Sequence, residues 1–438
     1  MSRRPKLHHP LPGPQAQAII DACEAVVSSS YTRDYPLVAD RGEGCWIIDP
    51  DGNEFLDVTA GIAVCATGHS HPEIVAAITE QAGKLIHMSG TDFYYAPQTR
   101  LAAALSHRVP IKNGPARVHF SNSGAEANEA AMKLARWATG RANFIAFANS
   151  FHGRTYGAMS LTASKVRQRE RFGPFLPGVF HTSYPDPYRM GGDAAATRRC
   201  LDHLEEMFLT VVAPAEVAAI FVEPVQGEGG YVLPPDAFLH ALRELCDRHG
   251  ILLVFDEVQS GMGRTGKLWA CEHSGVQPDI LTSAKGIASG MPLGATFASR
   301  ALMSWPPGAH ASTFGGNPVS CAAALKTLEI LDRELIANAA EVGEILLATL
   351  RRLVGDHPRV GDIRGRGLMV GVELVKDRET RERDPDLRNR VVTTCFEQGL
   401  LILGCGRNTI RFAPALTLSP YEATLAAELF ASALQTTA

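Results

Sequence analysis

The sequence predicts an α/β fold, with a mostly parallel central sheet covered by helices in a large domain and a smaller α+β domain beside it. Short apolar runs alternate with helical periodicity from about residue 115 to 300, which is the pattern of a parallel sheet with crossover helices. The run ILLVF at 251–255 has no polar alternation, which is typical of a strand covered on both faces. A chain of 438 residues is also long enough for more than one domain.

The alternating region predicts individual strands and helices in chain order. The segment 124–140 has the pattern of a helix that ends at Gly140. Asp236 is expected to cap a second helix over 236–249, with Gly250 as its stop. The expected strands are RVHFS (117–121), FIAFA (144–148), AIFVE (219–223), ILLVF (251–255), DILTSA (279–284) and GATFAS (294–299).

The two ends of the chain have a different pattern. Residues 37–58 contain a DPDG turn between alternating segments, which predicts a hairpin. A long amphipathic helix over 326–353 follows the alternating region, and a strand-like segment, another helix and the segment 408–416 come after it. We expect an N-terminal segment 1–70 that joins the small domain, a large domain 71–325 and a C-terminal small domain 326–438.

Composition argues against several classes of protein. The formal net charge is −4 and the pI is near 6.4, so nothing indicates a nucleic-acid partner or a polybasic membrane surface. No run approaches the roughly 18 apolar residues of a membrane span. The nine cysteines are scattered without a CxxC pair, which predicts reduced thiols in a cytoplasmic protein and no metal site.

Ligands of an open α/β sheet bind beyond the carboxyl ends of its strands. ILLVF runs directly into Asp256 and Glu257, so two carboxylates are expected at that edge. The turn SNSGAEAN (121–128) leads from a strand into a helix, where Ser123, Gly124 and Ala125 would offer a phosphate site. A capped helix with small residues for close packing explains the same letters.

Three further segments place reactive groups at strand ends. NSFHGRTYG (149–157) offers an aromatic ring, an imidazole and a guanidinium, which suit a planar charged ligand, although a surface loop with a packed Phe would look similar. FVEPVQGEGG (221–230) contains Glu223 and Glu228, either as an acid–base pair or as partners of a ligand-binding arginine. Lys285 follows an apolar run, where burial lowers the pKa of an amine and favours Schiff-base formation. A lysine that extends from a strand end into solvent is the alternative.

Together these groups match what pyridoxal 5′-phosphate requires. Its phosphate needs N–H donors, its ring needs stacking partners and its aldehyde needs an amine. Its pyridine nitrogen needs a carboxylate to stay protonated, and Asp256 would form a charge-assisted pair with it. Without such a ligand, burial of that carboxylate would be costly.

The chain resembles the class III pyridoxal-phosphate aminotransferases of fold type I, the group of 4-aminobutyrate, ornithine and related ω-aminotransferases. The resemblance covers nearly the whole chain through the motifs TGHSHP, SNSGAEANEA, FHGRT, EPVQGEGG, DEVQSGMGRTG, AKG, STFGGNP and RGRGLMVGVEL. It implies that Lys285 is the catalytic lysine, which forms a Schiff base with the cofactor. The cofactor-binding residues that it implies are Ser123, Gly124, Ala125, Phe151, His152, Asp256, Val258, Gln259, Lys285 and Thr313.

The same resemblance implies the role of each group around the cofactor. Asp256 would hold the pyridine nitrogen, with Val258 under the ring and Phe151 above it. Gln259 would lie near the phenolic oxygen. Thr313 would reach the phosphate of the neighbouring subunit, which implies a homodimer with active sites at the interface and leaves a tetramer open.

The resemblance also implies how substrates bind. Arg154 would bind the distal carboxylate of the amino donor. Arg411 would bind the α-carboxylate of 2-oxoglutarate or glutamate and pair with Glu228 when that group is absent. Glu223 matches the acid beside the substrate arginine, and Ile62 matches the apolar residue at the site entrance. The implied reaction is a ping-pong transfer of an amino group from an ω-amino acid such as 4-aminobutyrate, or a related amine, to 2-oxoglutarate or pyruvate.

Two other functions stay open at this stage. The segments 90–98, 159–165 and 400–414 resemble a branch of the family that also contains amino-acid racemases and epimerases. Both chemistries begin with loss of the Cα proton, so motifs for the cofactor do not separate them. A non-catalytic binding protein on the same fold is a third possibility, which the presence of both Lys285 and Asp256 disfavours. The physiological amine and keto acid are not specified by these motifs.

Overall fold

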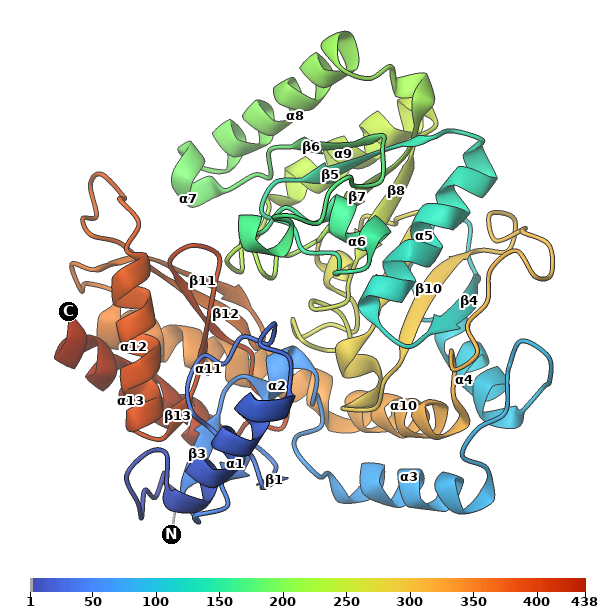
Figure 1. Cartoon of the computed structure of the whole chain (residues 1–438). Helices are drawn as coiled ribbons and strands as arrows, with labels where there is room; N and C mark the ends of the chain where they lie inside the picture. Colours follow the sequence, from blue (N-terminus) through green and yellow to red (C-terminus); the bar gives the residue numbers. More distant parts are fainter. Residues whose placement is uncertain (1–2) are drawn as a thin grey trace.

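The computed structural model describes residues 3–438, which form three sheets and the helices that cover them (Figure 1). The largest sheet has seven strands in the order β4-β10-β9-β8-β7-β5-β6. Neighbouring strands are parallel except at β10, which runs antiparallel to β4 and β9. The predicted mostly parallel central sheet is therefore confirmed. Its strands are β4 Ala116–Ser121, β5 Asn143–Phe147, β6 Val179–Thr182, β7 Val217–Val222, β8 Leu252–Asp256, β9 Ile280–Ser283 and β10 Gly294–Ser299.

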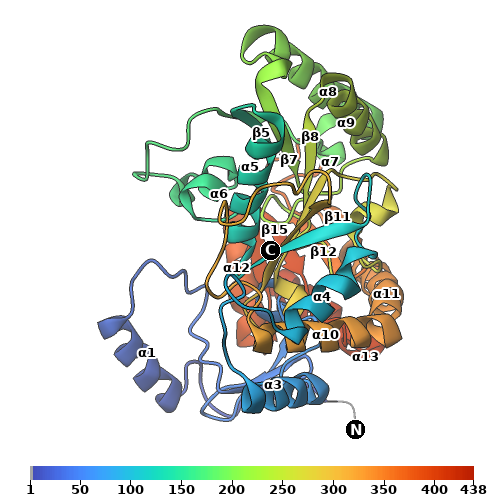
Figure 2. The ribbon, with the colours of Figure 1, turned by 90° about the vertical axis from the view of Figure 1, so that its right-hand side faces the viewer.

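Helices cover both faces of this sheet. Figure 2 shows α5 and α6 on one side of the strands and α8 and α9 on the other. The helix α5 ends at Gly140 and α9 ends at Gly250, each with a positive φ that suits glycine, so both predicted stops are confirmed. The helices of this region are α3 Pro72–Lys84, α4 Ala96–Ser106, α5 Gly124–Thr139, α6 Tyr156–Leu161, α7 Pro187–Met190, α8 Asp193–Thr210 and α9 Asp236–His249, with the short 3₁₀ helices η1 Val166–Gln168, η2 Pro214–Glu216, η3 Ala270–His273 and η4 Lys285–Ala288.

One capping prediction is wrong. Asp236 is the first residue of α9, and Pro235 occupies the cap position without a side-chain hydrogen bond. The carboxylate of Asp236 instead lies 3.3 Å from a guanidinium nitrogen of Arg366. An acidic side chain in the first turn still interacts favourably with the positive end of the helix, so the sequence signal identified the helix start but not the capping group.

The two ends of the chain build the other two sheets. The strand β3 pairs with β2 in the hairpin expected around DPDG, and it also pairs in parallel with β13, where Leu56 lies opposite Leu400. The N-terminal and C-terminal parts therefore lie side by side, at the lower left of Figure 1. The division into 1–70, 71–325 and 326–438 stays a prediction. The elements of this region are α1 Pro14–Val26, β1 Arg41–Glu43, β2 Trp46–Ile48, β3 Glu54–Asp57, α2 Ala60–Ala63, β11 Val360–Arg366, β12 Met369–Leu374, α12 Pro385–Glu397, β13 Leu400–Leu401, β14 Leu403–Cys405, β15 Thr409–Phe412 and α13 Pro420–Thr437.

The long helix that was expected over 326–353 begins earlier. It consists of α10 (Pro318–Ile330), a π-helical turn η5 (Leu331–Leu335) and α11 (Ile336–Val354). The side chain of Asn317 caps it by accepting a hydrogen bond from the amide of Val319 at 2.9 Å. The helix α10 packs against α3, α4 and η4 and is buried over most of its residues. Because its apolar residues do not form a single stripe, no amphipathic pattern marks its start.

The carboxyl ends of the parallel strands meet at one edge of the large sheet. The strand β8 ends at Asp256, β7 leads into Glu223, and β9 leads through Ala284 into Lys285. The strands themselves are anchored by side chains such as Phe221 and Phe255, which are fully buried. A rigid sheet thus presents polar groups from several strands to the same space. No helix within residues 3–438 is long and apolar enough to cross a membrane.

Candidate active site

A cavity of about 370 Å³ lies beyond this edge of the sheet. Nine of the ten cofactor-binding residues predicted from the sequence line it, and Glu223 and Arg154 line it as well. They come from the starts of α5 and η4 and from the loops that follow β5, β7 and β8. The nine are Ser123, Gly124, Ala125, Phe151, His152, Asp256, Val258, Gln259 and Lys285.

Asp256 is a buried carboxylate with hydrogen bonds to both of its oxygens. His152 Nδ1 donates to Oδ2 at 2.8 Å, and the Asn128 amide donates to the same oxygen at 2.7 Å. The backbone amide of Val258 donates to Oδ1 at 3.0 Å. Burial opposes protonation of His152, but its hydrogen bond to Asp256 outweighs burial and raises the pKa of the imidazole. The network therefore fixes the orientation of the Asp256 carboxylate, which lines the cavity.

Asn128 is a site residue that the sequence interpretation missed. Its side chain is fully buried and donates to the carbonyl of His152 at 2.8 Å, in addition to Asp256. Its own oxygen accepts a hydrogen bond from Thr282 Oγ1 at 2.9 Å. One asparagine thus links α5, β8, β9 and the loop after β5. The available signal was a polar residue on a helix face otherwise built from alanine, methionine and leucine.

The start of α5 offers free N–H groups to the cavity. Ser123 caps the helix, because its hydroxyl accepts a hydrogen bond from the amide of Glu126 at 3.2 Å. The first helical amides, those of Gly124 and Ala125, have no intrahelical acceptor. A Cβ atom on Gly124 would lie only 2.7 and 2.9 Å from the two methyl carbons of Val258. The two interpretations of this turn, a capped helix with close packing and a site that could bind a phosphate, are therefore compatible.

Lys285 follows β9 in a strained and partly buried conformation. Its φ of +50° is in the left-handed region, which costs a residue with a side chain about 1 kcal/mol or more. Burial lowers the pKa of its amine to about 8, with Glu228 opposing and Arg411 adding to the effect. An amine with this pKa is partly uncharged near neutral pH and is available as a nucleophile.

A second cavity of about 690 Å³ adjoins the first, since Val64, Phe151, Arg154 and Lys285 line both. Arg411 and Glu228 lie in it and form a buried ion pair through Nη1 and Oε1. Burial alone would raise the pKa of Glu228, but Arg411, followed by Lys165, lowers it to about 2. The carboxylate therefore stays charged at any physiological pH.

Lys165 and Arg388 are further cations of this second cavity that the sequence interpretation did not identify. Lys165 Nζ lies 3.6 Å from Glu228 Oε2. Ile62 also lines the cavity, is 45% exposed and has a φ of +66°. Its role at the entrance of the site stays a prediction.

Glu223 and Gln259 are fixed by neighbours from other loops. The carboxylate of Glu223 accepts hydrogen bonds from the amides of Phe151 at 3.1 Å and Gly227 at 2.9 Å. Burial raises the pKa of Glu223 to about 7. Although both residues are described, no ion pair joins Glu223 to Arg154, whose guanidinium carbon instead lies 5.9 Å from the centre of the Phe151 ring. Gln259 Oε1 accepts a hydrogen bond from the hydroxyl of Tyr231 at 2.8 Å, a partner that the sequence did not indicate.

Thr313 is the one predicted cofactor residue that the structure does not bring to this site. It lies in the loop between β10 and α10, is exposed, and lines neither cavity of its own chain. Its neighbour Phe314 is 60% exposed. Whether Thr313 serves another subunit therefore depends on assembly.

The arrangement fits pyridoxal phosphate. The only ion-pair partner of Asp256 within residues 3–438 is His152, so its carboxylate can also accept a hydrogen bond from a protonated ring nitrogen. The turn at Gly124 has no side chain that would fill the space above Val258. The amine of Lys285 lines the same cavity as these groups. The residues that could hold the cofactor are thus present with the chemistry that it needs.

Comparison with protein families and curated proteins places the chain among known enzymes. The sequence model of the family described as aminotransferase class-III matches residues 27–434. The alanine/serine racemase of Pyrococcus horikoshii is 39% identical over 99% of this chain and 93% of that protein. The acetylornithine aminotransferase of a Nostoc species is 41% identical over 95% and 93%, and the 4-aminobutyrate aminotransferase of Escherichia coli is 40% identical over 88% and 90%.

Solved structures give the same result. An aminotransferase of Bacillus anthracis superposes with a TM-score of 0.90 at 34% identity, over 96% of this chain and 99% of that one. An amine transaminase from an uncultivated Pseudomonas species, solved in its PLP-bound form, superposes with a TM-score of 0.86 at 35% identity, over 94% and 98%.

Proposed function

The chain belongs to the class III aminotransferases, pyridoxal-phosphate-dependent enzymes of fold type I, and we propose that it transfers the amino group of an ω-amino acid such as 4-aminobutyrate to 2-oxoglutarate or pyruvate. The observation that most supports this substrate class is the buried ion pair between Glu228 and Arg411 in the cavity that adjoins Lys285. Arg154 lines the same cavity, together with Arg33 and Arg388. Arg411, which a carboxylate covers, and Arg154 suit substrates that carry one or two carboxylates.

Bound in the first cavity, pyridoxal phosphate supplies an electron sink that stabilises negative charge on the carbon beside the amino group. We assign the amides of Gly124 and Ala125, with Ser123, to its phosphate. Asp256 accepts a hydrogen bond from the ring nitrogen, and His152 and Asn128 hold that carboxylate in place. The remaining cofactor contacts that we assign are Phe151 and Val258 to the two faces of the ring and Gln259 to its phenolic oxygen.

Lys285 is assigned two tasks in this proposal. Its uncharged amine would hold the cofactor through the aldehyde, and the lowered pKa of about 8 keeps a usable fraction of that amine uncharged. With cofactor and substrate bound, Lys285 Nζ would be the group that takes up and returns the proton of the substrate carbon. Replacement of Lys285 by Ala should therefore abolish turnover and leave bound cofactor without its covalent bond to the chain.

The pair of Glu228 and Arg411 explains how one cavity accepts two kinds of substrate. Breaking a buried ion pair without replacement costs about 3–5 kcal/mol. With 4-aminobutyrate bound, Glu228 keeps Arg411 neutralised, and Arg154 binds the distal carboxylate. With 2-oxoglutarate bound, its α-carboxylate takes the place of Glu228 on Arg411, so the guanidinium is never left alone. Glu223 and Ile62 shape the wall and the entrance.

A half-reaction tests this function. Purified holoenzyme is mixed with 4-aminobutyrate without an acceptor, and the visible absorption of the bound cofactor is followed. We expect the starting band to disappear and to return when 2-oxoglutarate is added. Arg154→Ala should weaken the reaction with 4-aminobutyrate more than the reaction with an amine that lacks a distal carboxylate. Arg167→Ala removes an exposed arginine outside both cavities and should leave the reactions with both amines unchanged. Equal losses across all amines would reject the role of Arg154.

Similarity to the alanine/serine racemase supports a second candidate, racemisation of an amino acid with the same cofactor residues. A racemase returns the proton to the substrate carbon from the opposite face, with no keto acid consumed. Chiral chromatography of a single enantiomer incubated with the enzyme alone separates the two functions. Loss of optical purity, together with an unchanged absorption band in 4-aminobutyrate, would replace the aminotransferase proposal.

We further propose that the enzyme is a homodimer in which Thr313 reaches the phosphate of the partner chain. The His87 ring contacts the Phe314 ring of this loop at a tilt of 35°, with 4.7 Å between ring centres. Large apolar side chains are exposed around this loop, and they are Ile86, Met88, Phe93, Tyr94 and Phe314. Light scattering should give the mass of a dimer, and Thr313→Ala should weaken cofactor binding although Thr313 lies outside both cavities of its own chain. A monomer, or unaltered cofactor affinity, would contradict this assembly.

The cytoplasmic location expected from the sequence is kept as part of the proposal. All nine cysteines are free thiols in the structure. Seven of them are buried, where they behave as small apolar residues. Such a chain requires no oxidising compartment to fold.

A further inference from the structure

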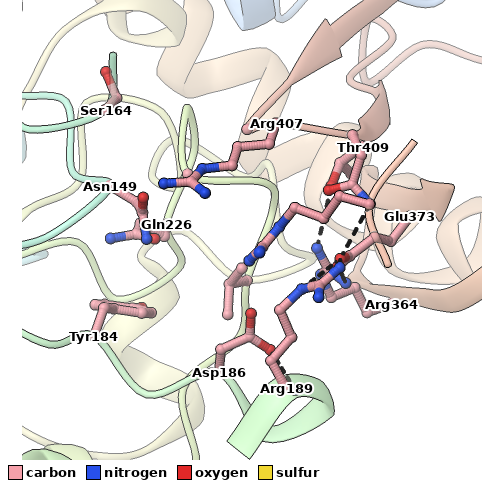
Figure 3. Close-up of a pocket in the computed structure, with 15 residues that line it drawn as sticks. Asn149, Ser164, Tyr184, Asp186, Arg189, Gln226, Arg364, Glu373, Arg407 and Thr409 are labelled. Carbon is pink, nitrogen blue, oxygen red and sulfur yellow. Dashed lines mark hydrogen bonds and ion pairs between the residues drawn. The ribbon is translucent and has the colours of Figure 1, made fainter. Parts of the chain in front are cut away.

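A third cavity, of about 220 Å³, lies behind the turn that carries Glu228 (Figure 3). It shares no lining residue with the two cavities of the active site. Its walls come from the loop after β5, the turn at 226–232, the start of α7 and the sheet of β11, β12 and β15. It thus opens between the large sheet and a sheet of the C-terminal part.

The cavity is rich in arginine. Arg189 and Arg364 converge on the buried carboxylate of Glu373, with Nε of Arg189 at 2.8 Å and Nη1 of Arg364 at 2.7 Å (Figure 3). Arg383 and Arg407 also line it, and neither has an ion-pair partner among residues 3–438. Two of the four guanidiniums are therefore uncompensated.

Asp186, the other acid that lines the cavity, forms no ion pair with these arginines among residues 3–438. Asp186 accepts a hydrogen bond from the amide of Arg189 at 3.2 Å, and burial raises the pKa of its carboxyl group, which disfavours its charged form. Burial and the positive charges of Arg189 and Arg407 lower the pKa of Arg383. The positive charges of Arg383 and Arg407 are therefore not balanced by ion pairs within the described part of the chain.

Neutral groups beside the arginines add further hydrogen-bonding capacity. Arg407 extends toward Asn149 and Gln226 in Figure 3. The side-chain amide of Gln226 donates to the carbonyl of Ala148 at 2.8 Å, which fixes that wall. A guanidinium presents two parallel N–H groups that match the oxygens of a carboxylate or a phosphate. The chemistry of the cavity is therefore that of an oxyanion receptor.

We propose that this cavity binds a small anion that bears a phosphate or carboxylate group, held by Arg383 and Arg407, and that the bound anion restrains the turn that carries Glu228. The amide of Gly406, next to Arg407, donates to the carbonyl of Glu228 at 2.8 Å. On the other side, Arg364 Nη2 donates to the carbonyl of Gly230 at 2.6 Å. An anion that fixes Arg407 thus fixes the backbone on which Glu228 moves.

Binding is tested by titration calorimetry on holoenzyme, in which the cofactor already fills the phosphate site of the first cavity. Inorganic phosphate and malonate are the two probes, so that the arms separate a phosphate ligand from a carboxylate ligand. We expect one site per chain for at least one probe, weakened by about tenfold or more in Arg383→Gln and in Arg407→Gln. Arg378→Gln removes an exposed arginine of the same loop as Arg383 and should bind like the wild type.

Absence of binding for both probes would overturn the site. Binding that neither variant weakens would also overturn it, because the anion would then bind elsewhere on the chain. The effect on Glu228 rests on the proposed function and has its own readout. The probe that binds should change the KM for 2-oxoglutarate in the wild type and in Arg378→Gln but not in Arg383→Gln. Binding without this change would overturn the coupling while the site stands. An enzyme without aminotransferase activity would refute the proposed function and leave the calorimetric result intact.

Discussion

The close contact between Gly124 and Val258 makes the floor of the cofactor cavity sensitive to a single methyl group. In Gly124→Ala the new Cβ would lie 2.7 and 2.9 Å from the two methyl carbons of Val258. Carbon atoms normally approach to about 3.5–4.0 Å, so a shift of roughly 1 Å is required. Val258 cannot withdraw freely, because its amide donates to Asp256 Oδ1 at 3.0 Å.

The expected loss of cofactor affinity follows from the two ways in which this close contact can be relieved. Val258 can move into the cavity, or the start of α5 can move away and take the amides of Gly124 and Ala125 with it. Overpacking of this kind costs about 1–3 kcal/mol. Either movement raises the free energy of the cofactor-bound protein more than that of the apoprotein. We therefore expect cofactor affinity to fall by about 5- to 150-fold.

The assay is titration of apoenzyme with pyridoxal phosphate, followed by the visible absorption of bound cofactor. In the double variant Gly124→Ala/Val258→Ala the opposing methyl groups are gone, so it should bind better than the sum of the two single variants predicts. Gly83→Ala is the matched control, because nothing lies within 4 Å of its added Cβ in the exposed part of α3. It should leave cofactor affinity unchanged and stabilise the helix by roughly 1 kcal/mol. Unchanged affinity in Gly124→Ala, or additive losses in the double variant, would refute the argument.

Three further predictions concern buried charges. Glu228→Gln leaves Arg411 without its carboxylate, so the half-reaction with 4-aminobutyrate should slow by about tenfold or more while the KM for 2-oxoglutarate does not rise. The rates of the two half-reactions are measured separately, and equal losses in both would contradict this role of Glu228. Burial lowers the pKa of Lys285 from 10.5 to about 8, so between these values the unfolded chain binds a proton that the folded chain lacks. The stability of apoenzyme relative to Lys285→Met should therefore rise with pH across this window, by roughly 3 kcal/mol in total, and urea unfolding that shows parallel pH profiles would exclude it. Asn128→Ala removes a donor from buried Asp256 and should lower the free energy of unfolding by about 1–3 kcal/mol, with weaker cofactor binding, and an unchanged melting temperature would be inconsistent with this role.

The sequence alone predicted the strand–loop–helix units and which residues stand at the strand ends. The glycine stops at Gly140 and Gly250 are local signals, because only the residue at the helix end has to adopt a positive φ. The polar groups after β7, β8 and β9 meet because parallel strands present their carboxyl ends at one edge. Both inferences need only short stretches of chain and a general rule of sheet geometry.

The helix α10 shows where local signals fail. The start of α10 at Pro318 is hidden, since a helix buried on most sides has no amphipathic stripe. The antiparallel strand β10 is likewise indistinguishable by its apolar pattern from β9, which belongs to the parallel part of the sheet, because both strands are fully buried. The hydrophobic pattern of a strand indicates which of its faces are buried, but not whether the strand is parallel or antiparallel to its neighbours.

Only the tertiary structure decided which groups hold the site residues and which charges remain unpaired. Asn128 lies far along the chain from Asp256, and Gly406 far from Glu228, yet each pair is joined by a hydrogen bond. The unpaired state of Arg383 and Arg407 depends on Glu373 being already shared by two other arginines. Such contacts depend on the distance between segments after folding, and no local pattern of residue types encodes that distance.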